Sequence, residues 1–358
     1  VLSGNGHQGV AIRSNGNQVK GNHIGTNAAG TAAVGGGGIF IFRGASNNII
    51  GGSEAGARNI ISGNSGSGIS INVFEATGAT GNVVQGNYIG TNAAGTAAVP
   101  NGNQGIVLAS VSGNIIGGSQ PGQGNLVSGN NGDGIFIIDN SQNNSVLGNR
   151  VGTNATGTAP IPNNLSGIAV INSTGNIIGG TTAGAGNLIS GNTASGVVLN
   201  NNTQNNQVIG NFIGTNPPGT AAIPNNVYGI FILTNSTGND IGGTAAGAGN
   251  LISGNNSDGI HIATGSHNNR LLGNRIGTNA DGIAALPNTF NGISVNNSNG
   301  TIIGGSQEGA RNLVSGNGQH GIIINNNSAN AQITGNYVGT NAAGNAAIAN
   351  GFNGVIVV

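Results

Sequence analysis

Residues 187–192 read Asn187-Leu-Ile-Ser-Gly-Asn192, and a closely related phrase, Asn87-Tyr-Ile-Gly-Thr-Asn92, stands earlier in the chain. Both follow the pattern Asn-x-Ile/Val-x-x-Asn, with a small or hydroxyl-bearing residue in the gaps. The closing asparagine recurs at Asn5, Asn27, Asn64, Asn92, Asn130, Asn154, Asn192, Asn216, Asn255, Asn279, Asn317 and Asn341. This regular recurrence predicts one supersecondary unit that is stacked many times.

The tripeptide Gly-Thr-Asn marks every second copy of the phrase. It ends at Asn27, Asn92, Asn154, Asn216, Asn279 and Asn341, so successive copies lie 62 to 65 residues apart. Each period holds two related sub-units, and each sub-unit has three short apolar pieces bounded by Gly, Asn and Ser. Such pieces, rich in Ile and Val, are typical of strands. No segment keeps the apolar period of a helix.

The pattern therefore predicts an all-β fold with essentially no α-helix, namely a single parallel β-helix of about twelve coils, with three short strands in each coil and neighbouring coils about 4.8 Å apart. We expect residues 1–358 to form one continuous domain built of double-coil repeats of about 62 residues. An asparagine that recurs at one position can hydrogen-bond the coils above and below it. We expect a structural ladder of Asn27, Asn64, Asn92, Asn130, Asn154, Asn192, Asn216, Asn255, Asn279, Asn317 and Asn341.

Composition excludes several classes of partner. The chain has 8 basic and 8 acidic residues, Lys20 is its only lysine, and the arginines are scattered. Nucleic-acid backbones need clustered Lys and Arg, so we expect no nucleic-acid partner. There is no cysteine, which excludes disulfides and thiolate metal sites. No apolar run approaches the roughly 18–20 residues of a membrane span, so we expect no membrane insertion.

Three recurring phrases, Asn-x-Ile-Gly-Gly, Asn-Leu-Ile-Ser-Gly-Asn and Gly-Asn-x-Ile-Gly-Thr-Asn, carry a resemblance that covers the whole chain. They resemble the phrases of right-handed parallel β-helix repeat proteins of bacterial surface or secreted type, in the pectate-lyase-like fold superfamily. Proteins of this fold include pectate-lyase-like enzymes, phage tailspikes, adhesins and long surface proteins. The resemblance implies a rod-like module that is extracellular or at the cell surface.

One column of residues precedes the Ile or Val of every second sub-unit, and most of its members are large and flat. The column consists of His23, Tyr88, Arg150, Phe212, Arg275 and Tyr337. Exposed aromatic and arginine side chains are favoured where surfaces meet. Two interpretations stay open: the column caps the adjacent loops, or it forms a stripe that stacks on sugars or on another subunit.

Two types of loop also recur at every second coil, and they predict two ridges with rungs about 10 Å apart along the rod. The first type includes residues 53–58 and 306–311, and the second includes residues 93–100 and 217–224. In the first type, Glu54 with Arg58 and Glu308 with Arg311 are expected to form solvated ion pairs of small energetic value. The functional alternative for these pairs is a contact between neighbouring rods.

The acidic residues do not form a compact group. They are Glu54, Glu75, Asp133, Asp139, Asp240, Asp258, Asp281 and Glu308. Glycosidases need two carboxylates roughly 5–9.5 Å apart, whereas Asp133 and Asp258 would lie about 19 Å apart across four coils. The best local group, Asp240, Asp258, His261 and His320, is interpreted as surface variation, because metal sites need converging ligands. We expect no catalytic residue, no metal site and no cofactor.

The leading hypothesis is a non-enzymatic extracellular structural protein, a β-solenoid rod that contributes to a fibre, sheath or surface layer by end-to-end stacking. It predicts self-association into a homo-oligomer or filament, with surface polysaccharide as a further partner. The alternative is a carbohydrate-binding or adhesin module that uses the column at Tyr88 and Tyr337. A polysaccharide lyase or hydrolase is the third hypothesis, and it requires a compact group of carboxylates that the sequence does not show.

Overall fold

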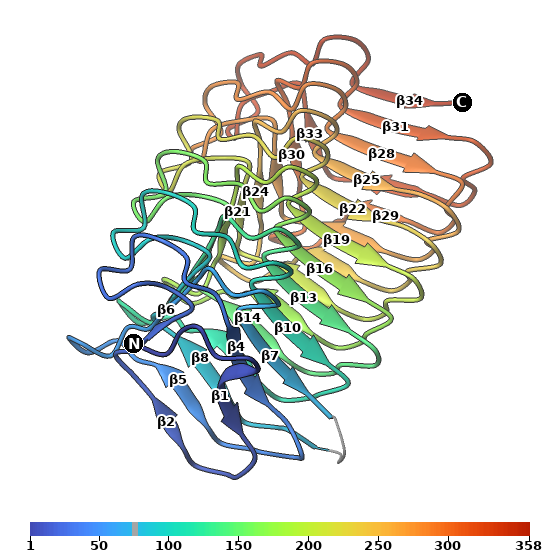
Figure 1. Ribbon diagram of the computed structural model, residues 1–358. Helices are drawn as coiled ribbons and strands as arrows, with labels where there is room; N and C mark the ends of the chain where they lie inside the picture. The colour runs from blue at the N-terminus through green and yellow to red at the C-terminus, as the bar shows by residue number, and fades with distance from the viewer. Residues whose placement is uncertain (74–77) are drawn as a thin grey trace.

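The computed structural model describes residues 1–73 and 78–358. In this part of the chain, three parallel sheets wind into a right-handed β-helix of about twelve turns, without any helical segment. The two ends of the chain lie at opposite ends of the rod (Figure 1). The predicted all-β fold is confirmed, and no segment of the described residues is a helix that could cross a membrane.

Sheet A contains the shortest strands, and each has two residues. Its strands, in spatial order, are β3 (His23–Ile24), β6 (Ile60–Ile61), β9 (Tyr88–Ile89), β12 (Leu126–Val127), β15 (Arg150–Val151), β18 (Leu188–Ile189), β21 (Phe212–Ile213), β24 (Leu251–Ile252), β27 (Arg275–Ile276), β30 (Leu313–Val314) and β33 (Tyr337–Val338).

Sheet B contains the longest strands and forms the broad face seen in Figure 1. Its strands are β1 (Gln8–Ile12), β4 (Gly37–Ile41), β7 (Ile69–Asn72), β10 (Ile106–Ala109), β13 (Ile135–Ile138), β16 (Ile168–Ile171), β19 (Val197–Asn200), β22 (Ile230–Ile232), β25 (Ile260–Ile262), β28 (Ile293–Asn296), β31 (Ile322–Asn325) and β34 (Val355–Val357).

Sheet C closes each coil before the chain returns to sheet A. Its strands are β2 (Gln18–Val19), β5 (Ile49–Gly51), β8 (Val83–Gln85), β11 (Ile115–Gly117), β14 (Ser145–Leu147), β17 (Ile177–Gly179), β20 (Gln207–Ile209), β23 (Asp240–Gly242), β26 (Arg270–Leu272), β29 (Ile302–Gly304) and β32 (Gln332–Thr334).

The core is a narrow column of Ile, Val and Leu side chains that point inward from all three sheets. In one coil, Ile168 and Val170 of sheet B, Ile178 of sheet C and Ile189 of sheet A are all 0% exposed. Successive side chains of a strand point to opposite faces, so a two-residue strand of sheet A buries its second residue and presents its first residue outward. The outward side chains of sheet A therefore fall into one file along the rod.

Three files of asparagine hold the corners of the described coils together. In the file between sheets C and A, Oδ1 of Asn149 accepts the backbone N–H of Asn125 at 3.0 Å and its side-chain N–H at 2.9 Å. Asn149 in turn donates both kinds of N–H to Oδ1 of Asn187, at 2.9 and 3.0 Å. Each amide oxygen thus accepts two N–H groups of a neighbouring coil. These N–H groups are buried, so they need a partner within the protein.

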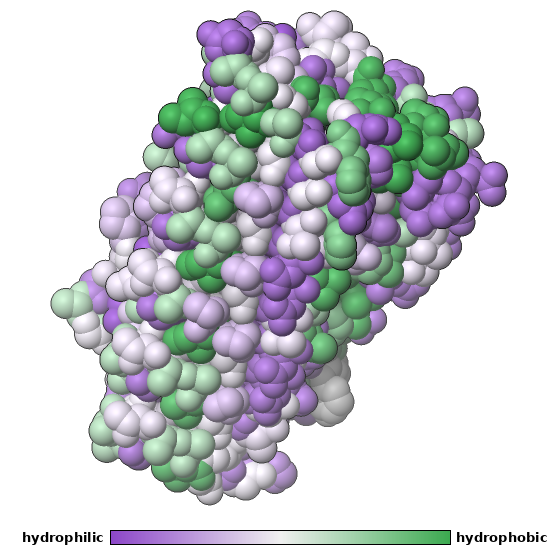
Figure 2. Space-filling model, turned by 90° about the horizontal axis from the view of Figure 1, so that it is seen from above, coloured by the Kyte–Doolittle hydropathy of each residue, from purple (hydrophilic) through white to green (hydrophobic). Residues whose placement is uncertain are grey.

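The two loop types project from the rod at every second coil. Loops of the first type connect sheet C to sheet A, and loops of the second type connect sheet A to sheet B. Second-type loops hydrogen-bond each other across two coils, as the N–H of Ala155 donates to O of Gly95 at 2.9 Å and that of Ala280 donates to O of Gly219 at 2.9 Å. In Figure 2, residues of intermediate and hydrophobic character, pale and green, recur along the rod beside a band of hydrophilic residues, purple. The loops therefore form two walls on either side of sheet A.

Candidate functional site

A groove runs along the outside of sheet A, between the two walls of loops. Its larger hollow has a volume of about 930 Å³ and extends from Arg58 and Tyr88 past Arg150 to Phe212. A second hollow of about 370 Å³ continues from Phe212 to Arg275, Arg311 and Tyr337. The two hollows share Phe212 and Gly247 in their linings, so they adjoin along sheet A and are together called the groove.

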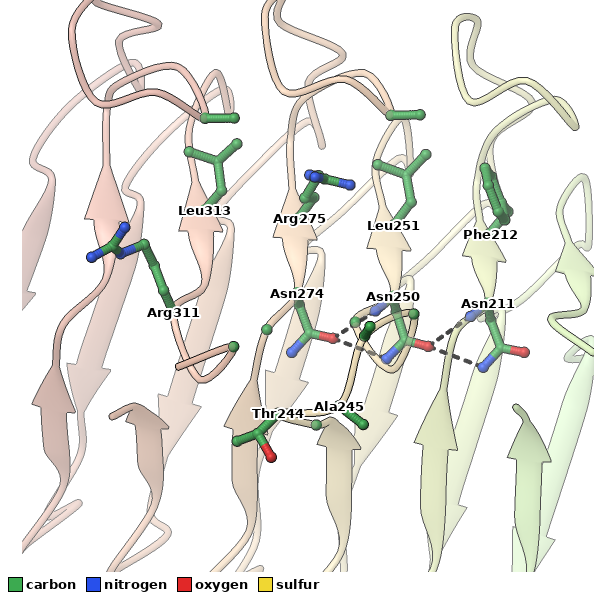
Figure 3. A pocket seen from close by; sticks show the side chains of 18 of the residues that line it. Asn211, Phe212, Thr244, Ala245, Asn250, Leu251, Asn274, Arg275, Arg311 and Leu313 are labelled. Carbon is green, nitrogen blue, oxygen red and sulfur yellow. Dashed lines mark hydrogen bonds between the residues drawn. The ribbon is translucent and has the colours of Figure 1, made fainter. Parts of the chain in front are cut away.

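The floor of the groove is the outward file of sheet A, in which large polar or aromatic residues alternate with aliphatic residues. Strand pairing places these residues side by side in the order His23, Ile60, Tyr88, Leu126, Arg150, Leu188, Phe212, Leu251, Arg275, Leu313 and Tyr337. Figure 3 shows Phe212, Leu251, Arg275 and Leu313 in a row on successive strands, with the amides of Asn211, Asn250 and Asn274 beside them. The whole column that the sequence singled out thus lies in one file.

We call the row of first-type loops the first wall and the row of second-type loops the second wall. Glycines of the second wall make close contact with this floor. Gly95 has a φ of 65°, and a Cβ there would lie 2.9 Å from the ring of Tyr88 and from the side chain of Leu126. Gly219 stands in the same relation to Phe212 and Leu251. The aromatic rings therefore pack against the loops on one side, whereas Arg150 and Arg275 are exposed in the groove.

Arginines of the first wall stack on the tyrosines of the floor. The guanidinium carbon of Arg58 lies 4.0 Å from the ring centre of Tyr88, and that of Arg311 lies 3.9 Å from the ring centre of Tyr337. These distances are typical of cation–π contacts. Neither contact was predicted from the sequence. The signal was present, because a first-type loop ends in arginine only where the next residue of the column is a tyrosine.

The ion pairs expected within the first-type loops are replaced by other contacts. Glu54 accepts a hydrogen bond from Nζ of Lys20 at 2.6 Å, and this bond holds the pKa of Glu54 below its ordinary value. Nε of Arg311 donates instead to O of Gly335 at 3.0 Å. The physical reason is that each arginine leaves its own loop to lie over an aromatic ring, where its charge is attracted by the ring face.

The groove has a positive electrostatic character. Four arginines, Arg58, Arg150, Arg275 and Arg311, line it, and none of the described residues in its lining is acidic. The walls of a groove reduce the screening of such charges by water and concentrate their field. A chain with zero formal net charge therefore presents one cationic groove that is also aromatic.

The predicted asparagine ladder separates into two sets. Asn64, Asn130, Asn192, Asn255 and Asn317 lie in the file between sheets A and B, where they alternate with Asn101, Asn163, Asn225, Asn288 and Asn350. Asn27, Asn92, Asn154, Asn216, Asn279 and Asn341 instead accept the N–H of the residue four positions later in their own loops. The sequence signal for the file between sheets C and A was the opening asparagine of the phrase, such as Asn187.

The polar group around Asp258 lies outside the groove, on sheet B and the turn before it. Oδ2 of Asp258 lies 2.8 Å from Nδ1 of His261, and its Oδ1 accepts two N–H groups of Asn291, each at 2.8 Å. The ring of Tyr228 stacks on His261 at 4.6 Å, and burial, followed by the charge of Asp258, raises the pKa of Tyr228. His320 bonds to Asn291 through its backbone.

Other members of the acidic set are dispersed. Asp240 forms a two-pronged ion pair with Arg270 on sheet C, at 2.6 and 2.7 Å. Glu75 lies outside the described residues. The described residues contain no cluster of His, Asp and Glu that could hold a metal ion. Asp133, in the turn before sheet B, accepts the N–H of Ser166 at 2.9 Å.

Comparison with solved structures identifies the architecture. A mutant of the periplasmic alginate epimerase AlgG matches the chain with a TM-score of 0.54 at 16% sequence identity, and the match covers 84% of this chain and 62% of that chain. The Dettilon tailspike protein gp208 matches with a TM-score of 0.41 at 14% identity, over 97% of this chain and 61% of that chain. No protein-family model matches the sequence, and neither does any curated protein. The match to AlgG shows the fold alone, a right-handed parallel β-helix, and the fold that the resemblance implied is thereby confirmed.

Two expectations from the sequence are corrected at this point. We expected a non-enzymatic structural rod of a fibre, sheath or surface layer, and no enzymatic activity. The solved structure that the chain matches with a TM-score of 0.54 is instead an alginate epimerase, so the expectation of a non-enzymatic structural fibre is wrong. The physical reason lies in the loops: the sequence predicted two ridges, but it did not reveal that they enclose a hollow with a floor of arginines and aromatic rings.

Proposed function

We propose that this chain is a carbohydrate-active protein that binds an extended acidic polysaccharide along the groove of sheet A, outside the cytoplasm. The observation that carries the proposal is the groove, whose lining combines four arginines with the rings of Tyr88, Phe212 and Tyr337 and contains no acidic side chain among the described residues. The proposal agrees with the alternative hypothesis of a carbohydrate-binding module that uses the column of sheet A, and it adds the arginines of the first-type loops to the binding surface.

The chemistry of the lining fits a polymer of acidic sugars. Arginine binds carboxylates and sulfates with two parallel hydrogen bonds, which a neutral sugar cannot accept in the same way. The ring of Phe212, in the middle of the groove, offers a flat apolar surface for the C–H face of a pyranose. The epimerase that shares this fold acts, by its name, on alginate, and this supports a polysaccharide as the ligand.

Direct binding measurements test the proposal. We expect the chain to bind polygalacturonate by isothermal titration and to bind dextran, a neutral polymer, far more weakly. Replacing Arg150 or Arg275 by alanine is expected to weaken binding about tenfold each, since a charge-assisted hydrogen bond contributes roughly 1.5 kcal/mol or more. Added salt is expected to weaken binding as well, because the contacts are ionic.

Arg270→Ala is the matched control. It removes the same charge, but Arg270 lies on sheet C, where it pairs with Asp240. We expect this variant to bind polygalacturonate like the unaltered chain. Equal losses for Arg270→Ala and Arg150→Ala would show that net charge, not the groove, determines binding. A chain that binds no acidic polysaccharide at all would overturn the proposal.

The stacked pairs of arginine and tyrosine favour one catalytic function for this groove, namely removal and return of the proton on the carbon next to a uronate carboxylate. An arginine that pairs with the carboxylate makes the adjacent C–H proton more acidic. A tyrosinate oxygen would take that proton and exchange it with solvent, and return of a solvent proton to the same carbon would complete the exchange. Arg58 with Tyr88 and Arg311 with Tyr337 are the two pairs. In heavy water, we expect deuterium to enter the polymer, as detected by NMR, and the double variant Tyr88→Phe/Tyr337→Phe to lose this exchange but keep binding. Polymer that stays free of deuterium would contradict this activity.

A further inference from the structure

We infer that the groove selects a polysaccharide that carries its acidic group on alternate sugars, with neutral sugars between them. This inference rests on the proposed function and makes it more specific. It follows from the spacing of the charges that line the groove. Arg58 over Tyr88 lies two coils from Arg150, Arg275 lies two coils from Arg311 over Tyr337, and Arg150 and Arg275 lie four coils apart.

The floor advances by one residue per coil, and neighbouring coils lie about 4.8 Å apart. An extended chain of linked pyranoses advances by a similar step for each sugar. Two coils, about 10 Å, therefore correspond to one disaccharide. A homopolymer of uronates carries a carboxylate on every sugar, whereas an alternating polymer carries one on every second sugar.

The floor of the intervening coils offers neither a cation nor an open surface. Their floor residues are Leu126, Leu188, Leu251 and Leu313, and all four are buried. Glycines of the second wall close over three of them, because a Cβ at Gly157, Gly219 or Gly282 would lie within 2.8 Å of a leucine methyl group. A carboxylate placed over such a coil would lose water without gaining a partner, which costs free energy.

We call two successive coils, one with a first-type loop and the next with a second-type loop, a unit. In each unit that carries a charge, the arginine occupies one of two positions. Where the floor residue is a tyrosine, the preceding first-type loop ends in an arginine, Arg58 before Tyr88 and Arg311 before Tyr337. Where the floor residue is itself an arginine, the matching loop position is a glycine, Gly124 before Arg150 and Gly249 before Arg275.

No unit of the described groove has both cations. The central unit, Phe212 with Gly186, has none. The groove thus presents two cations on each side of an uncharged centre, at a spacing of two coils except across that centre. This arrangement matches a regular acidic and neutral alternation at four of the five units, since a positive charge meets each acid except at Phe212 and an apolar floor meets each neutral sugar.

A competition between three polymers of matched length tests the inference. The probes are hyaluronan, in which glucuronate alternates with a neutral N-acetyl sugar, polygalacturonate, which has an acid on every sugar, and dextran. At one ionic strength, we expect the unaltered chain to bind hyaluronan about tenfold more tightly than polygalacturonate per mole of chain, a difference of about 1.4 kcal/mol.

Phe212→Arg provides a second measurement on a chain that is expected to fold. It copies the pairing of glycine and arginine already present at Arg150 and Arg275, and Phe212 is only partly buried. The positive charge that Phe212→Arg adds at the centre of the groove is expected to tighten hyaluronan binding several-fold. Circular dichroism checks that the variant keeps the β-helix.

Each outcome distinguishes the two claims. Tighter binding of hyaluronan supports the alternating ligand. Polygalacturonate binding that is equal or tighter overturns the inference and leaves the acidic-polysaccharide groove in place. If neither acidic polymer binds, the inference and the proposed function are both overturned.

Discussion

Replacing Asn149 by alanine is expected to lower the free energy of unfolding by about 4 kcal/mol, because each buried polar group left without a partner costs about 1–3 kcal/mol. The Asn149 side chain is 1% exposed. Its loss removes the acceptor of two N–H groups of Asn125 and the donor to O of Ile116 at 2.9 Å. Guanidinium unfolding followed by circular dichroism measures the effect, with hydrogen exchange as a local readout, because solenoids do not always unfold in one step.

Asn154→Ala is the matched control for this prediction. Asn154 belongs to the same recurring phrase, but it is partly exposed. Its Oδ1 accepts hydrogen bonds from its own loop, from the N–H of Thr158 at 2.8 Å, the N–H of Ala159 at 3.3 Å and the hydroxyl of Thr156 at 3.1 Å. Water can replace these bonds, so we expect a loss of about 1 kcal/mol, similar to the loss of a helix cap. Similar losses for both variants would show that the stacked amides contribute no more than an ordinary loop contact.

Asp133→Asn is expected to stabilise the chain at pH 8 by about 3 kcal/mol, since one unit of pKa corresponds to 1.36 kcal/mol. Burial raises the pKa of Asp133 from 3.8 to about 6, and the hydrogen bond that its Oδ1 accepts from the N–H of Ser166 offsets only part of this effect. The folded pKa lies above the unfolded value, so the unfolded chain releases its proton first. Stability then falls as pH rises from about 4 through 6.

Asparagine removes this penalty without removing the acceptor, and it already occupies the same turn position at Asn291 and Asn353. The advantage of the variant should vanish below about pH 4, where Asp133 is neutral in both states. Thermal unfolding of both chains between pH 3.5 and pH 8 checks the sign and the range. A variant that is less stable at pH 8 would contradict the assignment.

Asp258→Asn tests the same turn position with the opposite expected sign. Both oxygens of Asp258 are engaged, one by His261 and one by two N–H groups of Asn291. We expect this variant to lose about 1–2 kcal/mol at pH 7, because hydrogen bonds to charged groups contribute more than neutral ones. Stabilisation by Asp258→Asn would show that the bonds around His261 do not offset the cost of burying the carboxylate.

The fold was predictable because the sequence repeats it. Every coil reuses the same Asn, Gly and Ile positions, so the period gives the coils and the apolar pieces give the strands. The file of outward residues on sheet A could be found for the same reason, since it needs only the count of coils. Phe212 and Arg275 occupy equivalent positions in sequence, and strand pairing places them in one file.

Contacts between side chains of different coils were not predictable in the same way. Arg58 was expected to pair with Glu54 because both lie in one loop, yet its guanidinium stacks on Tyr88 of the next coil. The direction in which a loop leans depends on packing against loops two coils away, which the repeat pattern does not encode. Whether two ridges form a groove is decided by the same packing, and the expected function was wrong for that reason.

The contact between like loops two coils apart restricts how such a chain can change in length. The bond from Ala155 to Gly95 joins loops of one kind across a coil that carries no such loop. Duplicating or deleting a pair of coils keeps every loop beside its own kind and lengthens or shortens the groove by one disaccharide step. Gaining or losing a single coil would instead set unlike loops against each other and break both walls at that point, so viable variants of this molecule should differ in size by even numbers of coils.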